Sequence, residues 1–137
     1  SEHYDYAILD CPPVLGVLMV NALAASERIL VPVQTEFLAL KGLDRMMRTM
    51  DLMQSSQAKD YQYTIIPTMY DKRTKASLEA YKTLQSTYGD KVWPGVIPVD
   101  TKFRDASFAQ KVPVEYCPRS RGVYAYKALL EYLIEQG

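Results

Sequence analysis

Residues 4–16 read YDYAILDCPPVLG, and this stretch decides how the chain is interpreted. The apolar run over residues 6–9 is bounded by polar residues and turn signals, which is typical of an inner strand of a parallel sheet. Asp10 follows at once, and Pro12 and Pro13 then forbid further pairing because proline has no N–H to donate. We therefore predict a strand that ends at Asp10, at the edge of the sheet where α/β proteins bind ligands.

Asp10 has two interpretations. Four apolar residues followed by aspartate is the arrangement of a Walker B strand, whose carboxylate holds Mg²⁺ through oxygen or water ligands. The other interpretation is an aspartate that ends a strand and only begins a turn. On this short pattern alone both interpretations stay open.

Strand and helix patterns alternate along the rest of the chain. Connections of this length imply a parallel, right-handed, doubly wound sheet of at least four strands, with helices on both faces. After the first strand, further strands are predicted over residues 28–33, 63–69 and 96–99. Helices are predicted over residues 14–25, which should be buried, over residues 38–55 and 76–88, and after Gly122; residues 112–116 are predicted to be a short edge strand or an extended loop.

The helix predicted over residues 38–55 is rich in methionine. Leu40, Leu43, Met47 and Met50 recur at helical spacing, which favours burial in the core. A methionine-rich helix face is also adaptable enough to bind a partner protein. The spacing favours the core, and the partner-binding face is the alternative.

Length and composition indicate one globular domain. The 137 residues are 48% hydrophobic and 23% charged, and a chain of this length buries about two-thirds of its unfolded surface. No apolar run reaches the roughly 18–20 residues of a membrane span. Cys11 and Cys117 lack the spacing of a zinc site or disulfide framework, which favours a reducing cytoplasm.

The net charge of zero hides an uneven distribution. Residues 1–70 contain five Lys and Arg against eight Asp and Glu, whereas residues 71–121 contain ten against six. A local excess of this size favours contact with a polyanion through a patch. The chain as a whole is not a generally basic nucleic-acid binder.

Five stretches occur in order along residues 4–133: DCPPVLGVLMVNAL, ILVPVQTEFLALKGL, PTMYDKRT, IPVDTKFRDAS and PRSRGVYAYKAL. Together they resemble the C-terminal half of the ParA/MinD-type partitioning ATPases. The DKRT and PVDTKFRDAS stretches resemble most the ParC-like proteins that position chemotaxis arrays. The resemblance implies that residues 1–137 are the C-terminal part of a single ParA-type ATPase domain of the P-loop NTPase fold.

The sequence departs from this family in one important respect. It contains no deviant Walker A loop, KGGxGKT, and no Gly-x-x-x-x-Gly-Lys-Ser/Thr run. Without that loop the triphosphate has no cradle of N–H groups, so we expect the chain to be inactive alone and to need the missing P-loop strands. An incomplete sheet should also expose an edge and a hydrophobic seam.

The resemblance assigns roles to particular side chains. Asp10 is expected to act in catalysis by holding Mg²⁺, directly or through water, in an ATP site of the full-length protein. The residues implied to surround the nucleotide are Thr68, Met69, Tyr70, Asp71, Pro98, Val99 and Asp100. Those implied for the switch and dimer region are Pro12, Leu15, Gly16, Gln34 and Glu36, and those implied to bind DNA are Arg73, Lys75, Lys102 and Arg104.

Simpler roles stay open for several of these residues. Gln34 or Glu36 would equally cap the helix that follows. Arg73 would equally belong to a solvated charge cluster, although a cation in the first turn opposes the helix dipole and so points weakly to an anionic partner. Arg119 and Arg121 are expected to be solvated by default.

The function implied is ATP-dependent partitioning or positioning. An ATP-sandwich homodimer would bind nonspecific DNA and a cargo adaptor, ParB-like or chemotaxis-associated, in the cytoplasm at the nucleoid or cell pole. Membrane binding is disfavoured because residues 124–137 carry only Lys127 as a cation. Two alternatives are a metabolic P-loop enzyme, such as a relative of nitrogenase iron protein or dethiobiotin synthetase, and a non-catalytic module that binds protein through the methionine-rich helix.

Overall fold

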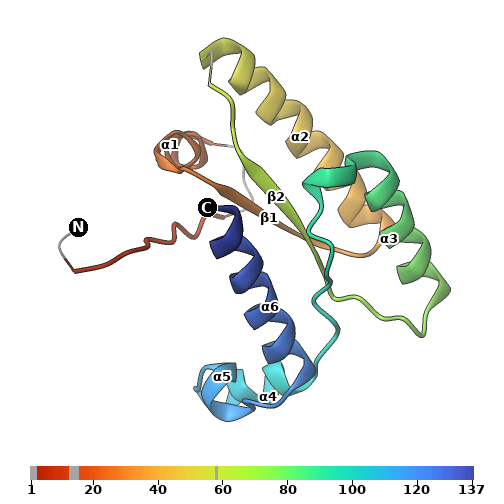
Figure 1. The fold of residues 1–137 in the computed structure, drawn as a ribbon. Helices are drawn as coiled ribbons and strands as arrows, with labels where there is room; N and C mark the ends of the chain where they lie inside the picture. The colour runs from red at the N-terminus through yellow and green to blue at the C-terminus, as the bar shows by residue number, and fades with distance from the viewer. Residues whose placement is uncertain (1–2, 13–15, 58) are drawn as a thin grey trace.

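The computed structural model describes residues 3–12, 16–57 and 59–137, and it has the α/β architecture that the sequence predicts (Figure 1). Helices and strands alternate along the first two-thirds of the chain, and helices follow. The elements are α1 (Val17–Ala25), β1 (Ile29–Gln34), α2 (Phe37–Gln57), β2 (Tyr63–Thr68), α3 (Lys75–Tyr88), a 3₁₀ turn (Gly89–Lys91), α4 (Lys102–Phe108), α5 (Pro113–Tyr116) and α6 (Arg121–Gln136).

β1 and β2 pair in parallel from Ile29↔Tyr63 to Gln34↔Thr68. Along β1 the side chains alternate between buried and exposed positions, as the period of a strand requires. The strands predicted from the second and third apolar runs are therefore confirmed. Because both strands run the same way, the loops that leave their carboxyl ends lie at one edge of the sheet.

Two cores lie on opposite faces of β2. Ile65 belongs to the larger core, with side chains of β1, α1, α2 and α3. Ile66, the next residue, belongs to a smaller core with Trp93, Ile97 and Leu129 of α6. In Figure 1, α2 and α3 lie along one side of the strands and α6 along the other. The prediction of helices on both faces is confirmed.

The methionine-rich helix α2 packs into the larger core. Leu40, Leu43, Met47 and Met50 are all buried, with exposed fractions of 4–7%. Burying side chains of this size contributes about 1.5–3 kcal/mol each relative to leaving them exposed. The core interpretation of this stripe is therefore confirmed.

The prediction of a strand over residues 96–99 is wrong. Beyond β1 and β2, the described residues add only two isolated parallel bridges, Ile65↔Val92 and Tyr70↔Pro98, so the sheet has two strands rather than four. Pro94 and Pro98 interrupt the segment, and neither can donate to a ladder. The segment follows β2 in the expected place but bonds to it only at separate points.

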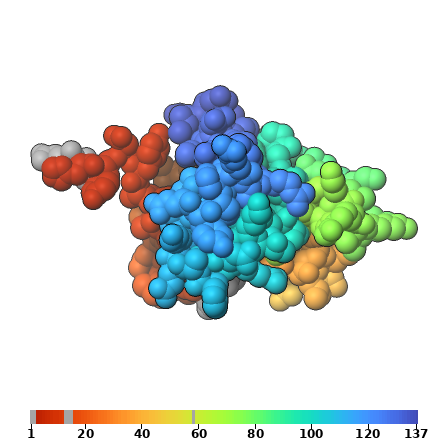
Figure 2. Space-filling model, turned by 90° about the horizontal axis from the view of Figure 1, so that it is seen from below, coloured from red at the N-terminus to blue at the C-terminus, as the bar shows by residue number. Residues whose placement is uncertain are grey.

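The prediction of a strand over residues 6–9 is also wrong. These residues have no regular structure, and Ile8 is 92% exposed. Figure 2 shows the N-terminal segment as an arm that stands out from the body of the molecule. A strand is held by cross-strand hydrogen bonds and by burial of its side chains. The described residues provide neither for this segment.

Helix α1 is less buried than its composition suggested. Met19 and Leu23 face the larger core, whereas Val17 and Leu18 are at least 75% exposed. Leu130 and Ile134 of α6 are also about half exposed, at 56% and 52%. The described residues thus leave several apolar side chains of α1 and α6 exposed, and within them β1 pairs only with β2.

Residues 113–116 form the short helix α5, so the predicted edge strand or extended loop is wrong here. Pro113 occupies the first turn, where its missing N–H costs nothing and its fixed φ suits a helix. The N–H of Cys117 donates to the carbonyl of Pro113 at 2.8 Å and closes the turn.

No helix in the part of the chain described is long and apolar enough to span a membrane.

Gly122 allows the first turn of α6 to approach α4 closely. A Cβ at Gly122 would lie 2.6 Å from Phe103 Cζ and 3.0 Å from Asp100 Oδ2. The Gly122 N–H donates to that same Oδ2 at 2.9 Å, and the ring of Phe103 stacks on Tyr126 with centroids 5.9 Å apart. This junction sets where the beginning of α6 lies relative to the sheet edge.

We predict that Gly122→Ala destabilises the protein by about 1–2 kcal/mol, because the crowding at Phe103 and Asp100 outweighs the better helix propensity of alanine. Gly42→Ala, in α2, is the matched control: its Cβ would meet nothing within 4 Å, and it should stabilise by up to about 1 kcal/mol. Urea unfolding of both variants measures the difference. Equal effects of the two substitutions would contradict the crowded junction.

Candidate functional site

Three segments are joined by backbone hydrogen bonds at the carboxyl edge of the sheet. The N–H of Thr35, just after β1, donates to the carbonyl of Thr68 at 3.0 Å. The N–H of Tyr70 donates to Ile97, and the N–H of Val99 donates to Tyr70, both at 3.1 Å. The two segments predicted to surround the nucleotide are thus brought together. Their N–H groups at Tyr70 and Val99 are engaged with each other's segment rather than free to read a base.

Two buried hydroxyl groups hold the loop after β2. Thr35 and Ser77 are 5% and 6% exposed, and their oxygens lie 2.9 Å apart. Thr35 Oγ1 also lies within 3.3 Å of the carbonyls of Thr68 and Met69, and Ser77 Oγ accepts from the N–H of Asp71 at 3.1 Å. Met69 has a φ of 52°, in the left-handed region that costs a side-chain-bearing residue energy. The hydroxyl groups therefore stabilise a strained loop.

Neither of these two hydroxyl residues was predicted to belong to the site. The alternation of β1, with Ile29, Val31 and Val33 inward, continues to Thr35 and signals that this side chain is buried. Ser77 lies in the first turn of α3, after the N-cap Thr74, whose hydroxyl accepts from the N–H of Ser77. The two-residue alternation of β1, extended by one step, would have identified Thr35 as a buried side chain. No local sequence pattern, by contrast, identifies Thr35 as the partner of Ser77.

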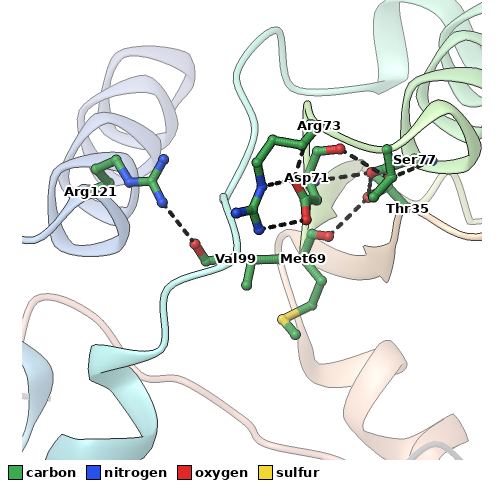
Figure 3. Close-up of polar contacts among 8 residues, drawn as sticks. Thr35, Met69, Asp71, Arg73, Ser77, Val99 and Arg121 are labelled. Carbon is green, nitrogen blue, oxygen red and sulfur yellow. Dashed lines mark hydrogen bonds and ion pairs between the residues drawn. The ribbon is translucent and has the colours of Figure 1, made fainter.

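Asp71 and Arg73 form a two-bond ion pair in this loop (Figure 3). Arg73 Nε donates to Oδ1 of Asp71 at 2.9 Å and Nη2 donates to Oδ2 at 3.0 Å, while the N–H of Arg73 also donates to Oδ1 at 3.0 Å. These bonds lower the pKa of Asp71 and raise the pKa of Arg73. The Arg73 side chain is 81% exposed and that of Asp71 only 22%. The Asp71 carboxylate is thus partly buried in the loop, whereas the Arg73 side chain is exposed to solvent.

Asp100 connects the last of the three segments to α6. Its Oδ1 accepts from the N–H of Lys102 at 3.0 Å, and its Oδ2 accepts from the N–H of Gly122 at 2.9 Å. Desolvation raises the pKa of Asp100, but the hydrogen bonds from Gly122, Lys102 and Ser120 outweigh it, so the pKa is lowered. The carboxylate is therefore charged at neutral pH and occupied by structural bonds.

A pocket of about 370 Å³ lies between this edge and the beginning of α6. Four cationic side chains line it, and its one lining acid, Asp100, is engaged as described above. Arg121 reaches across from α6, with Nη2 3.5 Å from the carbonyl of Val99. Several cations around one hollow attract an anion such as a phosphate group. The lining residues are Arg73, Val99, Asp100, Thr101, Lys102, Arg119, Ser120 and Arg121.

The pocket gathers only some of the predicted site residues. Arg73 and Lys102, predicted to bind DNA, line it together with two of the predicted nucleotide residues, Val99 and Asp100. Lys75 instead lies 3.7 Å from Glu79 on the surface of α3, and Arg104 is exposed on α4 outside the lining. Arg119 and Arg121, expected to be merely solvated, are part of the pocket.

The residues predicted for the switch and dimer region are not gathered in one place. Gln34 and Glu36 are exposed on either side of Thr35, and the carbonyl of Glu36 accepts from Leu40 at the start of α2. Pro12 is exposed in the N-terminal arm, Gly16 is the N-cap of α1, and Leu15 lies outside the described residues.

Asp10 is exposed in the N-terminal arm rather than at the end of a paired strand. Among the described residues, no group of three or more His, Cys, Asp or Glu side chains is placed to hold a metal ion. Mg²⁺ prefers near-octahedral oxygen coordination, and one exposed carboxylate does not provide it. The described residues therefore do not fit a Mg²⁺ site by themselves, and the assignment of Mg²⁺ to Asp10 stays a prediction.

Comparison with known proteins finds relatives that match nearly the whole chain. A family model described as an AAA domain matches residues 1–63. The chain is 36% identical to the sporulation initiation inhibitor protein Soj of Bacillus subtilis, covering 100% of this chain and 54% of Soj. It is 36% identical to the chromosome partitioning protein ParA of Caulobacter vibrioides, covering 97% of this chain and 50% of ParA. The chain thus spans about half the length of the curated relatives it matches.

A solved structure shows the same fold. The crystal structure of cobyrinic acid a,c-diamide synthase from Mycobacterium smegmatis, with bound ATP analog and magnesium, superposes with a TM-score of 0.71 at 30% sequence identity. The match covers 91% of this chain and 45% of that protein. The partly doubly wound α/β fold that the sequence predicts is therefore confirmed.

We predict that Ser77→Ala destabilises the protein by about 1–3 kcal/mol, because the partly buried N–H of Asp71 and the buried hydroxyl of Thr35 each lose a partner. Ser86→Ala is the matched control on the same helix, since the Ser86 hydroxyl bonds only to an exposed carbonyl of its own helix; it should change the stability by less than about 0.5 kcal/mol. Thermal unfolding of the two variants compares them. A Ser77→Ala variant as stable as the control would contradict the hydroxyl network.

Proposed function

We propose, from the premise that this chain belongs to the ParA/MinD family, that it is part of an ATP-dependent partitioning protein. Its relatives include the chromosome partitioning protein ParA of Caulobacter vibrioides and the chromosome-partitioning ATPase Soj of Treponema pallidum, and the related synthase structure holds an ATP analog with magnesium. The full-length protein would hydrolyse ATP and act as an ATP-sandwich homodimer in the cytoplasm, at the nucleoid or cell pole. It would carry cargo through a ParB-like or chemotaxis-associated adaptor.

The observation that supports an anionic partner is the basic pocket. Arg73, Lys102, Arg119 and Arg121 line it from the loop after β2, from α4, from the loop before α6 and from the first residue of α6. Cations held on separate elements keep their spacing when one side chain moves, which suits repeated contact with the phosphates of a DNA backbone. We propose nonspecific DNA as the partner, with Arg73 as its central contact.

The nucleotide site would form around the same edge of the sheet. The segments of Tyr70 and Val99, already bonded to each other, would form the wall around the base. ATP with Mg²⁺ supplies the phosphoanhydride bond whose hydrolysis would release the partner. The described residues would contribute the segments around the base and the nearby cationic side chains. The loop that binds the triphosphate would come from outside this chain.

A metabolic enzyme of the same superfamily is the second candidate, favoured by the structural similarity to cobyrinic acid a,c-diamide synthase. The two candidates differ in what the cations contact. A partitioning protein retains DNA when ATP is bound, whereas an enzyme that acts on a small molecule does not. DNA retention therefore separates them.

We predict that Arg73→Ala, in the natural full-length protein that contains this chain, weakens ATP-dependent retention of nonspecific DNA and lowers the slope of log affinity against log salt by about one. ATP binding should be unchanged, because the Arg73 side chain is 81% exposed and, among the described residues, its guanidinium bonds to the carboxylate of Asp71 alone. Filter retention of a random-sequence duplex over a salt series measures the DNA affinity and its salt slope.

Lys82→Ala is the matched control for Arg73→Ala. Lys82 is an exposed cation of α3, the helix that follows the loop of Arg73, and does not line the pocket. Its loss removes the same charge and should change DNA retention far less. Retention that is unchanged in Arg73→Ala, or equally reduced in Lys82→Ala, would remove Arg73 as a specific contact.

We predict that residues 1–137 alone show no detectable binding in a calorimetric titration with Mg-ATP. The sequence contains no glycine-rich loop with the lysine that cradles a triphosphate, and the described residues contain no cluster fit for the metal. Micromolar binding would reveal a phosphate site elsewhere in this chain and would contradict the incomplete-site interpretation.

A further inference from the structure

The ion pair between Asp71 and Arg73 uses only one edge of the guanidinium. Nε and Nη2 each donate to one carboxylate oxygen of Asp71, at 2.9 and 3.0 Å. An arginine has five N–H groups in a planar fork, so the edge formed by Nη1 and the second hydrogen of Nη2 is left for another acceptor. Figure 3 shows the outer end of this guanidinium turned away from Asp71, on the side where Arg121 lies.

Asp71 is anchored much more firmly than Arg73. Its N–H donates to the buried hydroxyl of Ser77, which bonds in turn to Thr35. Thr35 also holds the carbonyl of Met69, two residues before Asp71. An arginine that is 81% exposed would otherwise sample many rotamers, and ordering such a side chain on binding costs affinity. The anchored acid selects one of those rotamers in advance.

The selected rotamer places the free edge of Arg73 at the pocket that Lys102, Arg119 and Arg121 also line. Cations that share one hollow repel each other, and an anion between them relieves the repulsion. A phosphate group takes two parallel N–H bonds from one guanidinium edge. The Nη1–Nη2 edge offers such a pair while the Nε–Nη2 edge stays with Asp71.

Resting on the proposed DNA contact of Arg73, we propose that Asp71 is a positioning residue: it holds one edge of the Arg73 guanidinium so that the other edge meets a DNA phosphate at the mouth of the basic pocket. The acid acts through the arginine and does not contact DNA itself. Its role is opposite to the one that its charge suggests, since an isolated carboxylate beside DNA only repels phosphate.

The positioning role and a simple charge effect predict opposite changes in DNA retention when Asp71 is neutralised, so a substitution can distinguish them. Asp71→Asn removes one negative charge and weakens the grip on Arg73, so DNA retention by the full-length protein should fall about three- to tenfold. Asp105→Asn is the matched control: Asp105 lies on α4 beside Lys102 and Arg119, in the neighbouring hollow, and does not bond to Arg73. It removes the same charge and should leave retention unchanged or slightly stronger.

A double variant shows whether Asp71 acts through Arg73. Asp71→Asn should cause no further loss in an Arg73→Ala background, because the group that it positions is gone. Arg73→Lys keeps the charge but cannot take two parallel bonds, so it should lose as much retention as Asp71→Asn. Thermal unfolding should be nearly unchanged in all these variants, because the ion pair is at the surface.

The outcomes separate this inference from the proposed function. If Arg73→Ala retains DNA normally, the proposed DNA contact is wrong and the inference is wrong with it. If Arg73→Ala loses retention while Asp71→Asn behaves like Asp105→Asn, the DNA contact stands and the positioning role is overturned. An equal loss from Asp71→Asn with and without Arg73 would overturn it as well.

Discussion

The parallel pairing of β1 with β2 is the constraint on which the other elements depend. Within β2, Ile65 is fully buried under α2 and α3, while its neighbour Ile66 is buried under α6. One short strand thus anchors both helix layers through adjacent side chains that point to opposite faces. The carboxyl end of the same strand continues into the loop of Met69 and Asp71. The loop that carries Asp71 and Arg73 is therefore placed directly by this pair of strands.

The loop after β2 illustrates how buried polar groups support an exposed function. The hydroxyl groups of Thr35 and Ser77 satisfy the backbone of a strained turn, and the turn holds Asp71. Such a network is costly unless every member is bonded, and in the described residues no buried side-chain nitrogen or oxygen lacks a partner. The buried hydroxyl groups in this way fix the position of Asp71, and Asp71 in turn orders the exposed side chain of Arg73.

Periodic patterns predicted the fold well where burial is complete. The stripe of Leu40, Leu43, Met47 and Met50 and the alternation of β1 each follow from packing against one core, which a local pattern records. Residues 6–9 and 96–99 have the composition of strands, but strand formation also needs a neighbour to pair with. In the described chain the first run has none, and prolines interrupt the second. Composition does not reveal either condition.

The candidate site was predicted in part for a related reason. The resemblance of the ordered motifs to the partitioning ATPases pointed to the segments of Tyr70 and Val99 and to the cation Arg73. Arg119 and Arg121 lie some fifty residues beyond Arg73 and reach the pocket only because Gly122 lets α6 approach Asp100. The Thr35–Ser77 contact joins residues on different elements in the same way. Contacts of this kind depend on packing distances that no local spacing encodes.

The interrupted attachment of the segment beside β2 has a consequence for its motions. Trp93, Ile97 and Val99 each donate a single backbone bond to the β2 side, rather than belonging to a continuous ladder. A ladder opens cooperatively, whereas separate bonds break one at a time. Amide hydrogen exchange at these three positions therefore reports local openings beside the pocket, while the amides that bond between β1 and β2 report larger, cooperative openings.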